Sequence, residues 1–358
     1  MSTADQPQLM SEHTRYWQSE ADFVLESGQV LGKLEIAYRT WGTLNAAGDN
    51  AVLICHALTG SADADDWWPG IIGEGLALDP RRDFIVCSNV IAGCYGSTGP
   101  LSVNPVTARR YGGNFPRATV RDMVAAQHLL IGALKINSLA LIIGPSMGGM
   151  QVLEWASMYP EQVRAIAPIG VSAKHSAWCI GNSEAQRQAI YADENWCKGH
   201  YALNARPERG FAVARMMAML SYRSWQNFES RFGRESDTSG GFTIESYLRY
   251  QGEKINTRFD AVSYVRLTEA MDSHDIGRGR DGIEKAMDKI LVPALVVSVE
   301  SDILYPPHEQ QWLAERLPNA RYRSLDSPHG HDGFLIDTEA LGLLVKEFRQ
   351  EPLALKAS

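Results

Sequence analysis

Short apolar runs alternate with longer amphipathic segments along most of this 358-residue chain. The apolar runs have the length and composition of buried strands. They lie at residues 51–55, 84–87, 140–143, 163–169 and 294–299, and residues 320–325 are expected to form a last strand. Near the N-terminus, residues 22–26 and 33–40 alternate between apolar and polar positions, with glycines between them. This pattern predicts an antiparallel strand pair there.

Two helices are predicted between and after the central strands. Thr119 is followed three residues later by Asp122, a variant of the capping box that begins a helix. A second helix is expected over residues 147–158, ending before Pro160. Strands that alternate with helices in this way form a mostly parallel sheet covered by helices on both faces. The predicted fold class is therefore α/β.

The alternation stops between residues 174 and 288, where helical patterns dominate and residues 211–222 form the most apolar segment. We interpret this stretch as a helical lid inserted into the core. The predicted organisation is an N-terminal arm at 1–20, a core at 21–173 and 289–358, and a lid at 174–288.

Composition restricts the function classes without selecting one. Apolar residues make up 45% and charged residues 21%, as in ordinary globular proteins, and the formal net charge is −8. This acidic excess argues against nucleic-acid and anionic-membrane partners. Five cysteines without a CxxC spacing argue against a disulfide framework. The polar N-terminus and the lack of an 18-residue apolar run predict neither signal peptide nor membrane span, so we expect a cytoplasmic protein.

The strongest chemical signal is the sequence Gly144-Pro-Ser-Met-Gly148, which directly follows the strand at 140–143. It matches G-x-S-x-G, the nucleophile elbow, in which a serine occupies a strained turn between a strand and a helix. Residues two before and two after the serine must be small to avoid the neighbouring chain. The pattern predicts Ser146 as a nucleophile.

An acyl-transfer site also needs donors for the oxyanion. We expect one donor at the backbone N–H of Met147, at the start of the helix, and a second in the loop after the strand at 51–55. Position favours Leu58 N–H for the second. His56 in the same loop is interpreted as a residue that orders the loop, in preference to a catalytic base.

The acid and the histidine should follow the serine in chain order. Asp302 lies beyond the strand at 294–299 and is preferred as the acid, with Glu300 as its rival. After the last predicted strand come His329 and His331, and spacing alone does not separate them. A HExxH motif and zinc-type Cys/His spacing are both absent, so no metal is expected.

Taken together, these motifs resemble the homoserine O-acyltransferase family of the α/β-hydrolase superfamily, and its acetyltransferase branch most. The resemblance extends from about residue 37 to 337. The matching stretches are YRTWGTLN at 38–45, NAVLICHALTG at 50–60, GCYGSTGP at 93–100, SMGGMQ at 146–151, ARM at 214–216, ESYL at 245–248, YQG at 250–252 and GHDGFL at 330–335.

The resemblance implies an α/β-hydrolase fold and a ping-pong reaction that serves methionine biosynthesis. Ser146 would accept an acyl group from acyl-CoA, with His331 as base and Asp302 behind it. Arg215 would bind the carboxylate of L-homoserine, and Asp332 would bind its amine. Acetyl-CoA would be a co-substrate, no cofactor would stay bound, and the protein would form a homodimer.

Several alternatives stay open. A succinyl donor would call for an extra cation soon after Asp302, and residues 303–306 supply none, which favours acetyl. Serine is one methylene shorter than homoserine and is a second acceptor to test. An esterase that uses water would need the same catalytic residues. A non-catalytic receptor on this fold is disfavoured because all three residue types of the triad are present.

Overall fold

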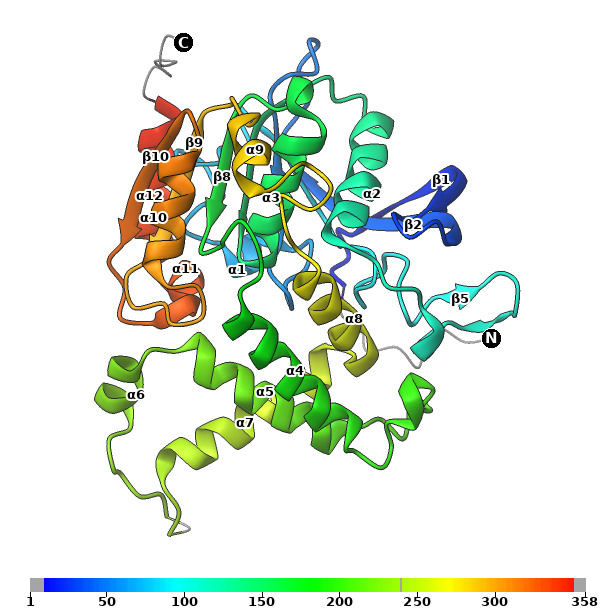
Figure 1. Cartoon of the computed structure of the whole chain (residues 1–358), viewed down its shortest axis with the longest axis vertical. Coiled ribbons are helices and arrows are strands. Elements are labelled where there is room, and N and C mark those ends of the chain that lie inside the picture. The colour runs from blue at the N-terminus through cyan, green and yellow to red at the C-terminus, as the bar shows by residue number, and fades with distance from the viewer. Residues whose placement is uncertain (1–9, 239, 351–358) are drawn as a thin grey trace.

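The computed structural model describes residues 10–238 and 240–350. Its centre is an eight-stranded sheet in the order β1-β2-β4-β3-β7-β8-β9-β10 (Figure 1). β1 pairs antiparallel with β2, and β2 pairs antiparallel with β4. The other pairs of neighbouring strands in this sheet, from β4 through β3, β7, β8 and β9 to β10, are parallel. The strands are β1 (Arg15–Val24), β2 (Val30–Trp41), β3 (Ala51–Ile54), β4 (Phe84–Ser88), β7 (Leu139–Pro145), β8 (Ile166–Ile169), β9 (Ala294–Val299) and β10 (Ala320–Leu325). A separate two-stranded ribbon consists of β5 (Val103–Asn104) and β6 (Arg109–Arg110).

The central strands are apolar throughout because helices cover both faces of the sheet. In β3, Leu53 packs into one hydrophobic cluster while Val52 and Ile54 pack into the other. The first cluster includes residues of α2 (Val120–Ala133), α3 (Met147–Met158) and α10 (Pro307–Arg316). The second includes residues of α1 (Ala64–Trp67), α11 (Gly333–Ile336) and α12 (Thr338–Gln350). The predicted strand-and-helix layers are thus present.

The predicted capping box is confirmed at the start of α2. Thr119 Oγ1 accepts a hydrogen bond from Asp122 N at 3.2 Å, and Thr119 N donates to an Asp122 carboxylate oxygen at 2.8 Å. The two bonds satisfy backbone donors that a helix start leaves free.

The structure corrects the predicted N-terminal arm. Residues 15–20 belong to β1 and pair with β2, and residues 1–9 lie outside the described residues. This strand has few buried positions, so its sequence lacks an apolar signal. Backbone pairing defines it, helped by buried Ser19, whose Oγ accepts from Leu34 N at 2.8 Å.

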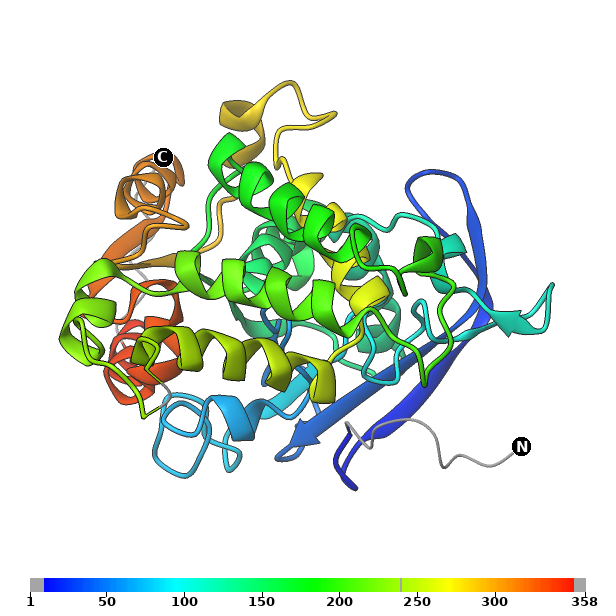
Figure 2. The same cartoon turned by 90° about the horizontal axis from the view of Figure 1, so that it is seen from below.

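The stretch between β8 and β9 is helical in its described residues and covers one end of the core. Figures 1 and 2 show α4, α5 and α7 side by side, with α6 at one end of this group, and α5 contacts both α4 and α7. Ala286 and Met287 of α9 are buried in the same hydrophobic cluster as Leu53 of β3. No helix in the described ranges is long and apolar enough to cross a bilayer. The helices are α4 (Ala177–Tyr191), α5 (Glu208–Tyr222), α6 (Trp225–Arg231), α7 (Thr243–Arg258), α8 (Ala261–Asp272) and α9 (Ile283–Asp288).

The chain enters α4 and leaves α8 through two paired segments. His175 N donates to His274 O, and Ile276 N donates to Ala173 O, each at 2.9 Å. The antiparallel bridge between Lys174 and Asp275 lies between these two bonds. The two chain connections to the lid helices therefore run side by side.

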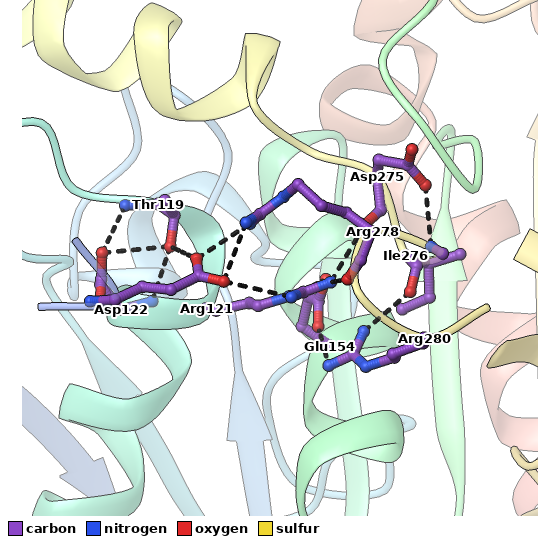
Figure 3. A network of polar contacts seen from close by, with 10 residues as sticks. Thr119, Arg121, Asp122, Glu154, Asp275, Ile276, Arg278 and Arg280 are labelled. Carbon is purple, nitrogen blue, oxygen red and sulfur yellow. Dashed lines mark hydrogen bonds and ion pairs between the residues drawn. The ribbon is translucent and has the colours of Figure 1, made fainter. Parts of the chain in front are cut away.

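An ionic network centred on the buried carboxylate of Glu154 fixes the returning segment to the helices beneath it (Figure 3). Glu154 of α3 lies 3.1 Å from Arg121 Nε of α2 and 2.7 Å from Arg280 Nη2. Arg121 Nη2 also donates to Arg278 O at 2.7 Å, and Arg278 pairs with Glu26 at 2.9 Å. The network therefore joins the lid's return segment to α3, the helix that directly follows Ser146.

Candidate active site

Ser146 occupies a strained turn between β7 and α3, with φ 54° and ψ −123°. Positive φ is costly for a residue with a side chain, and such strain gathers at functional sites. Gly144 and Gly148 flank the serine, and neither position has room for a side chain. A Cβ on Gly144 would lie 2.6 Å from Cys55 O, and one on Gly148 would collide with the same carbonyl group. The elbow therefore packs directly against the end of β3.

The structure brings Asp302 and His331 together at the carboxyl edge of the sheet. Asp302 Oδ2 lies 2.6 Å from His331 Nδ1, and both residues are only 3% exposed. Asp302 Oδ1 accepts from the backbone N–H groups of Leu304 and Tyr305 at 2.8 and 3.0 Å. With both oxygens engaged, the carboxylate holds the imidazole in one orientation.

This arrangement leaves one nitrogen of His331 available for chemistry. A carboxylate only accepts hydrogen bonds, so the Nδ1 facing Asp302 carries the proton. Nε2 is then the lone-pair nitrogen, and it has no hydrogen-bond partner among the described residues. His331 and Ser146 line the same cavity. An imidazole oriented in this way can take a proton from a hydroxyl.

The two rival residues lie elsewhere. Glu300 is exposed to solvent. His329 Nδ1 accepts a hydrogen bond from Asn227 Nδ2 at 2.8 Å, and His329 does not line the cavity of Ser146. Geometry thus separates His331 from His329, which spacing alone left undecided.

The loop after β3 carries Leu58, which lines the cavity, and Met147 begins α3 next to the serine. His56 lies in the same loop with both ring nitrogens held by backbone. Its Nδ1 is 2.8 Å from Ala57 O, and its Nε2 accepts from Val90 N at 3.2 Å. Burial lowers the pKa of His56 to about 4. A neutral, fully engaged imidazole orders this loop, as the sequence interpretation had it.

Opposite charges face the same cavity, whose volume is about 590 Å³. Arg215 reaches it from α5, with its guanidinium carbon 5.4 Å from the ring centre of Tyr222. No carboxylate among the described residues forms an ion pair with Arg215. Asp332 contributes the negative charge, and its Oδ2 lies 3.2 Å from Arg223 Nε.

Sequence reasoning missed several residues of this cavity. Tyr222 lies seven residues after Arg215, two helical turns along the same face, so helical spacing was a usable signal. Lys254 and Arg258 are four apart on α7 and both line the cavity. Arg258 also donates to Thr59 O at 2.9 Å, which ties α7 to the loop of Leu58. In the described part of the chain, no group of three His, Cys, Asp or Glu residues is placed to hold a metal ion.

Comparison with known proteins identifies the family. A model of the alpha/beta hydrolase fold matches residues 50–338. The homoserine O-acetyltransferase of Nostoc punctiforme is 57% identical over 344 residues, which cover 95% of this chain and 97% of the relative. That of Trichormus variabilis is 58% identical over 349 residues, covering 97% of each. The chain belongs to the homoserine O-acetyltransferase family. The predicted α/β-hydrolase fold and the family resemblance are confirmed.

Solved structures agree on the fold. A homoserine O-acetyltransferase from Bacillus anthracis superposes with a TM-score of 0.90 at 24% identity, covering 96% of this chain and all of that one. Esterase E22 superposes with a TM-score of 0.87 at 26% identity, covering 94% and 99%. Because a protein named as an esterase shares the fold so closely, the fold alone does not separate acyl transfer from hydrolysis.

Proposed function

We propose that this protein transfers the acetyl group of acetyl-CoA to the side-chain hydroxyl of L-homoserine, a step of methionine biosynthesis. The observation that carries the proposal is the cavity that Ser146 and His331 share with Arg215 and Asp332. A guanidinium matches an α-carboxylate, and a carboxylate matches an α-ammonium. An esterase for simple esters has no need of such a charge pair.

In the first half-reaction, His331 Nε2 takes the hydroxyl proton of Ser146 as Oγ attacks the thioester carbonyl carbon. Backbone N–H groups of Met147 and Leu58 stabilise the oxyanion, and each such donor contributes roughly 3–4 kcal/mol in related sites. The C–S bond then breaks and His331 returns the proton to the CoA thiolate. Asp302 stabilises the imidazolium formed in between.

In the second half-reaction, homoserine binds through Arg215 and Asp332 with its hydroxyl toward the acyl-serine. His331 removes the hydroxyl proton, and the oxygen attacks the acyl carbon. The bond to Ser146 Oγ breaks, and the proton passes from His331 to that oxygen. The Ser146 hydroxyl is regenerated and O-acetylhomoserine is released. The two substrates therefore react in turn, in ping-pong order.

The donor is assigned to acetyl because residues 303–306, which follow Asp302, contain no cation to receive a second carboxylate. The acceptor is assigned to homoserine because the family resemblance points to it, with serine as its shorter competitor. One methylene changes acceptor preference by only about 1–3 kcal/mol. The homodimer and the cytoplasmic location stay predictions.

The test is a matrix of acetyl-CoA and succinyl-CoA against homoserine and serine, measured as kcat/KM. We expect the acetyl-CoA and homoserine pair to exceed the others, and mass spectrometry to find an added acetyl group on Ser146 when the acceptor is omitted. Full turnover by Ser146→Ala, or an unmodified Ser146, would contradict the proposal.

Hydrolysis is the second candidate, favoured by the structural match to esterase E22. It predicts rapid release of acetate from p-nitrophenyl acetate at a rate that homoserine leaves unchanged. Acetyl transfer instead predicts that added homoserine captures the acetyl group as O-acetylhomoserine.

A further inference from the structure

The loop that carries His331 is held from two sides. On the core side, Ser301 Oγ donates to Ser327 O at 2.6 Å and accepts from Gly330 N at 2.9 Å. Ser301 immediately precedes Asp302, so this anchor joins the histidine loop to the turn of its own carboxylate partner. The other side of the loop faces the helices inserted between β8 and β9.

The second anchor comes from the junction of α5 and α6. Ser224 Oγ donates to Pro328 O at 2.5 Å, and Asn227 Nδ2 donates to His329 Nδ1 at 2.8 Å. Asn227 N in turn donates to Ser224 Oγ at 3.0 Å, which caps α6 and holds the Ser224 hydroxyl in place. Asn227 and Ser224 are buried, at 8% and 1% exposed.

Backbone packing shows how close this approach is. Gly330 has φ +66°, and an added Cβ would lie 2.7 Å from both Arg223 C and Ser224 N. Since that space is filled by backbone, the loop between His329 and His331 has no room to shift toward the lid. The hydrogen bonds of Ser224 and Asn227 on Pro328 and His329 keep it from moving away.

From these contacts we propose that Asn227 and Ser224 are positioning residues, and that the lid sets the orientation of His331 through them. We call the contacts of Ser224 with Pro328 and of Asn227 with His329 the clamp. In the clamp, His329 accepts the hydrogen bond from Asn227, so its role is structural. The inference rests on the proposed role of His331 as the base. It does not depend on which acyl donor or acceptor the protein uses.

The mechanism of the effect is geometric. Among the described residues, the His331 side chain makes one hydrogen bond, the 2.6 Å contact with Asp302, and its ring also packs against Tyr222, Tyr305 and Phe334. Its Nε2 must also meet Ser146. Loss of the Asn227 bond lets residues 328–330 relax and turns the imidazole relative to the serine. A misplacement of about 1 Å at a reacting group can reduce rate by about 100-fold.

The test measures the serine itself, without a natural substrate. A fluorophosphonate forms a P–O bond to Ser146 Oγ and loses fluoride, while His331 takes the proton, and the second-order rate is normalised by active-site titration. We expect Asn227→Leu to slow this reaction by about 10- to 100-fold. Asn227→Asp should stay within a few-fold of the unmodified protein, because His329 can donate Nδ1–H to the new carboxylate.

Asn182→Leu is the matched control. Asn182 is another lid asparagine, but its Nδ2 donates to Trp178 O of the same helix at 2.9 Å. This variant should react at the rate of the unmodified protein. Equal rates for Asn227→Leu and the unmodified protein, or an equal loss in both leucine variants, would overturn the inference. Failure of acetyl transfer with normal fluorophosphonate kinetics would refute only the proposed function.

A spectroscopic measurement tests the orientation of His331 directly, even in an Asn227 variant that folds but reacts slowly. The proton between His331 Nδ1 and Asp302 should give a low-field ¹H NMR resonance. We expect Asn227→Leu to shift or broaden it, and Asn182→Leu to leave it in place. Asn227→Ala provides the same comparison if the leucine variant does not fold, and an unchanged resonance in it would count against the clamp.

Discussion

Glu154→Gln removes the central charge of the network that attaches the lid's return segment to α2 and α3. The Glu154 side chain is 2% exposed, and its two arginine partners, Arg121 and Arg280, are 14% and 19% exposed. After the change, the largely buried guanidinium groups of Arg121 and Arg280 both lose their ion pair with Glu154. Breaking a buried ion pair in this way costs about 3–5 kcal/mol.

The expected value lies at the lower end of that range. Arg121 keeps its bond to Arg278 O at 2.7 Å and its ion pair with Glu26. Arg280 Nη1 keeps Ile276 O at 2.9 Å. Because these acceptors remain, neither guanidinium is left without partners. We expect urea titration at pH 7 to show a loss of about 3 kcal/mol in the free energy of unfolding.

Glu284→Gln is the matched control, since Glu284 also pairs with an arginine, Arg316, at 3.2 Å. Its side chain is 66% exposed and that of Arg316 is 46% exposed, so water screens the pair. Exposed pairs contribute about 0–1 kcal/mol. If Glu154→Gln loses no more stability than Glu284→Gln, the view of the network as the lid's anchor is wrong.

Three further predictions concern the site. Gly148→Ala places a methyl group against Cys55 O and should reduce kcat by at least about 100-fold, measured by release of the CoA thiol; near-normal kcat would contradict the close packing of the elbow. Asp302→Asn should reduce kcat about 10³- to 10⁴-fold, because the amide favours the wrong imidazole tautomer, and a loss below tenfold would exclude this role. His56 has a folded pKa of about 4 against 6.5 when unperturbed, so the unfolded chain binds the proton first as the pH falls. Stability should therefore decline between pH 6.5 and 4, by at most about 1.4 kcal/mol per pH unit from this group, and a urea midpoint that declines equally in His56→Gln would contradict it.

The parts of the fold that sequence predicted are those with a repeating apolar pattern or an obligatory local geometry. Residues 294–299 and 320–325 match β9 and β10 at both ends, and residues 147–158 match α3. The elbow was predictable because its glycines and its serine lie within five consecutive residues. Asp302 was predictable because a strand end fixes its position.

Other parts depend on contacts between distant segments, which no local pattern records. β1 is held mainly by pairing with β2, and most of its side chains are exposed, so periodicity gave no sign of residues 15–20. The contacts of Asn227 with His329 and of Arg223 with Asp332 span about a hundred residues. Choosing His331 over His329 needed the direction of each imidazole, which only the folded chain sets.

The strained backbone at Ser146 affects thermal stability as well as reactivity. Its φ of 54° and ψ of −123° suit a residue without a Cβ far better than serine. A glycine there would abolish chemistry while relieving strain of about 1–3 kcal/mol. The inactive glycine variant should therefore unfold at a higher temperature than the active enzyme, so thermal stability and turnover are opposed at a single residue.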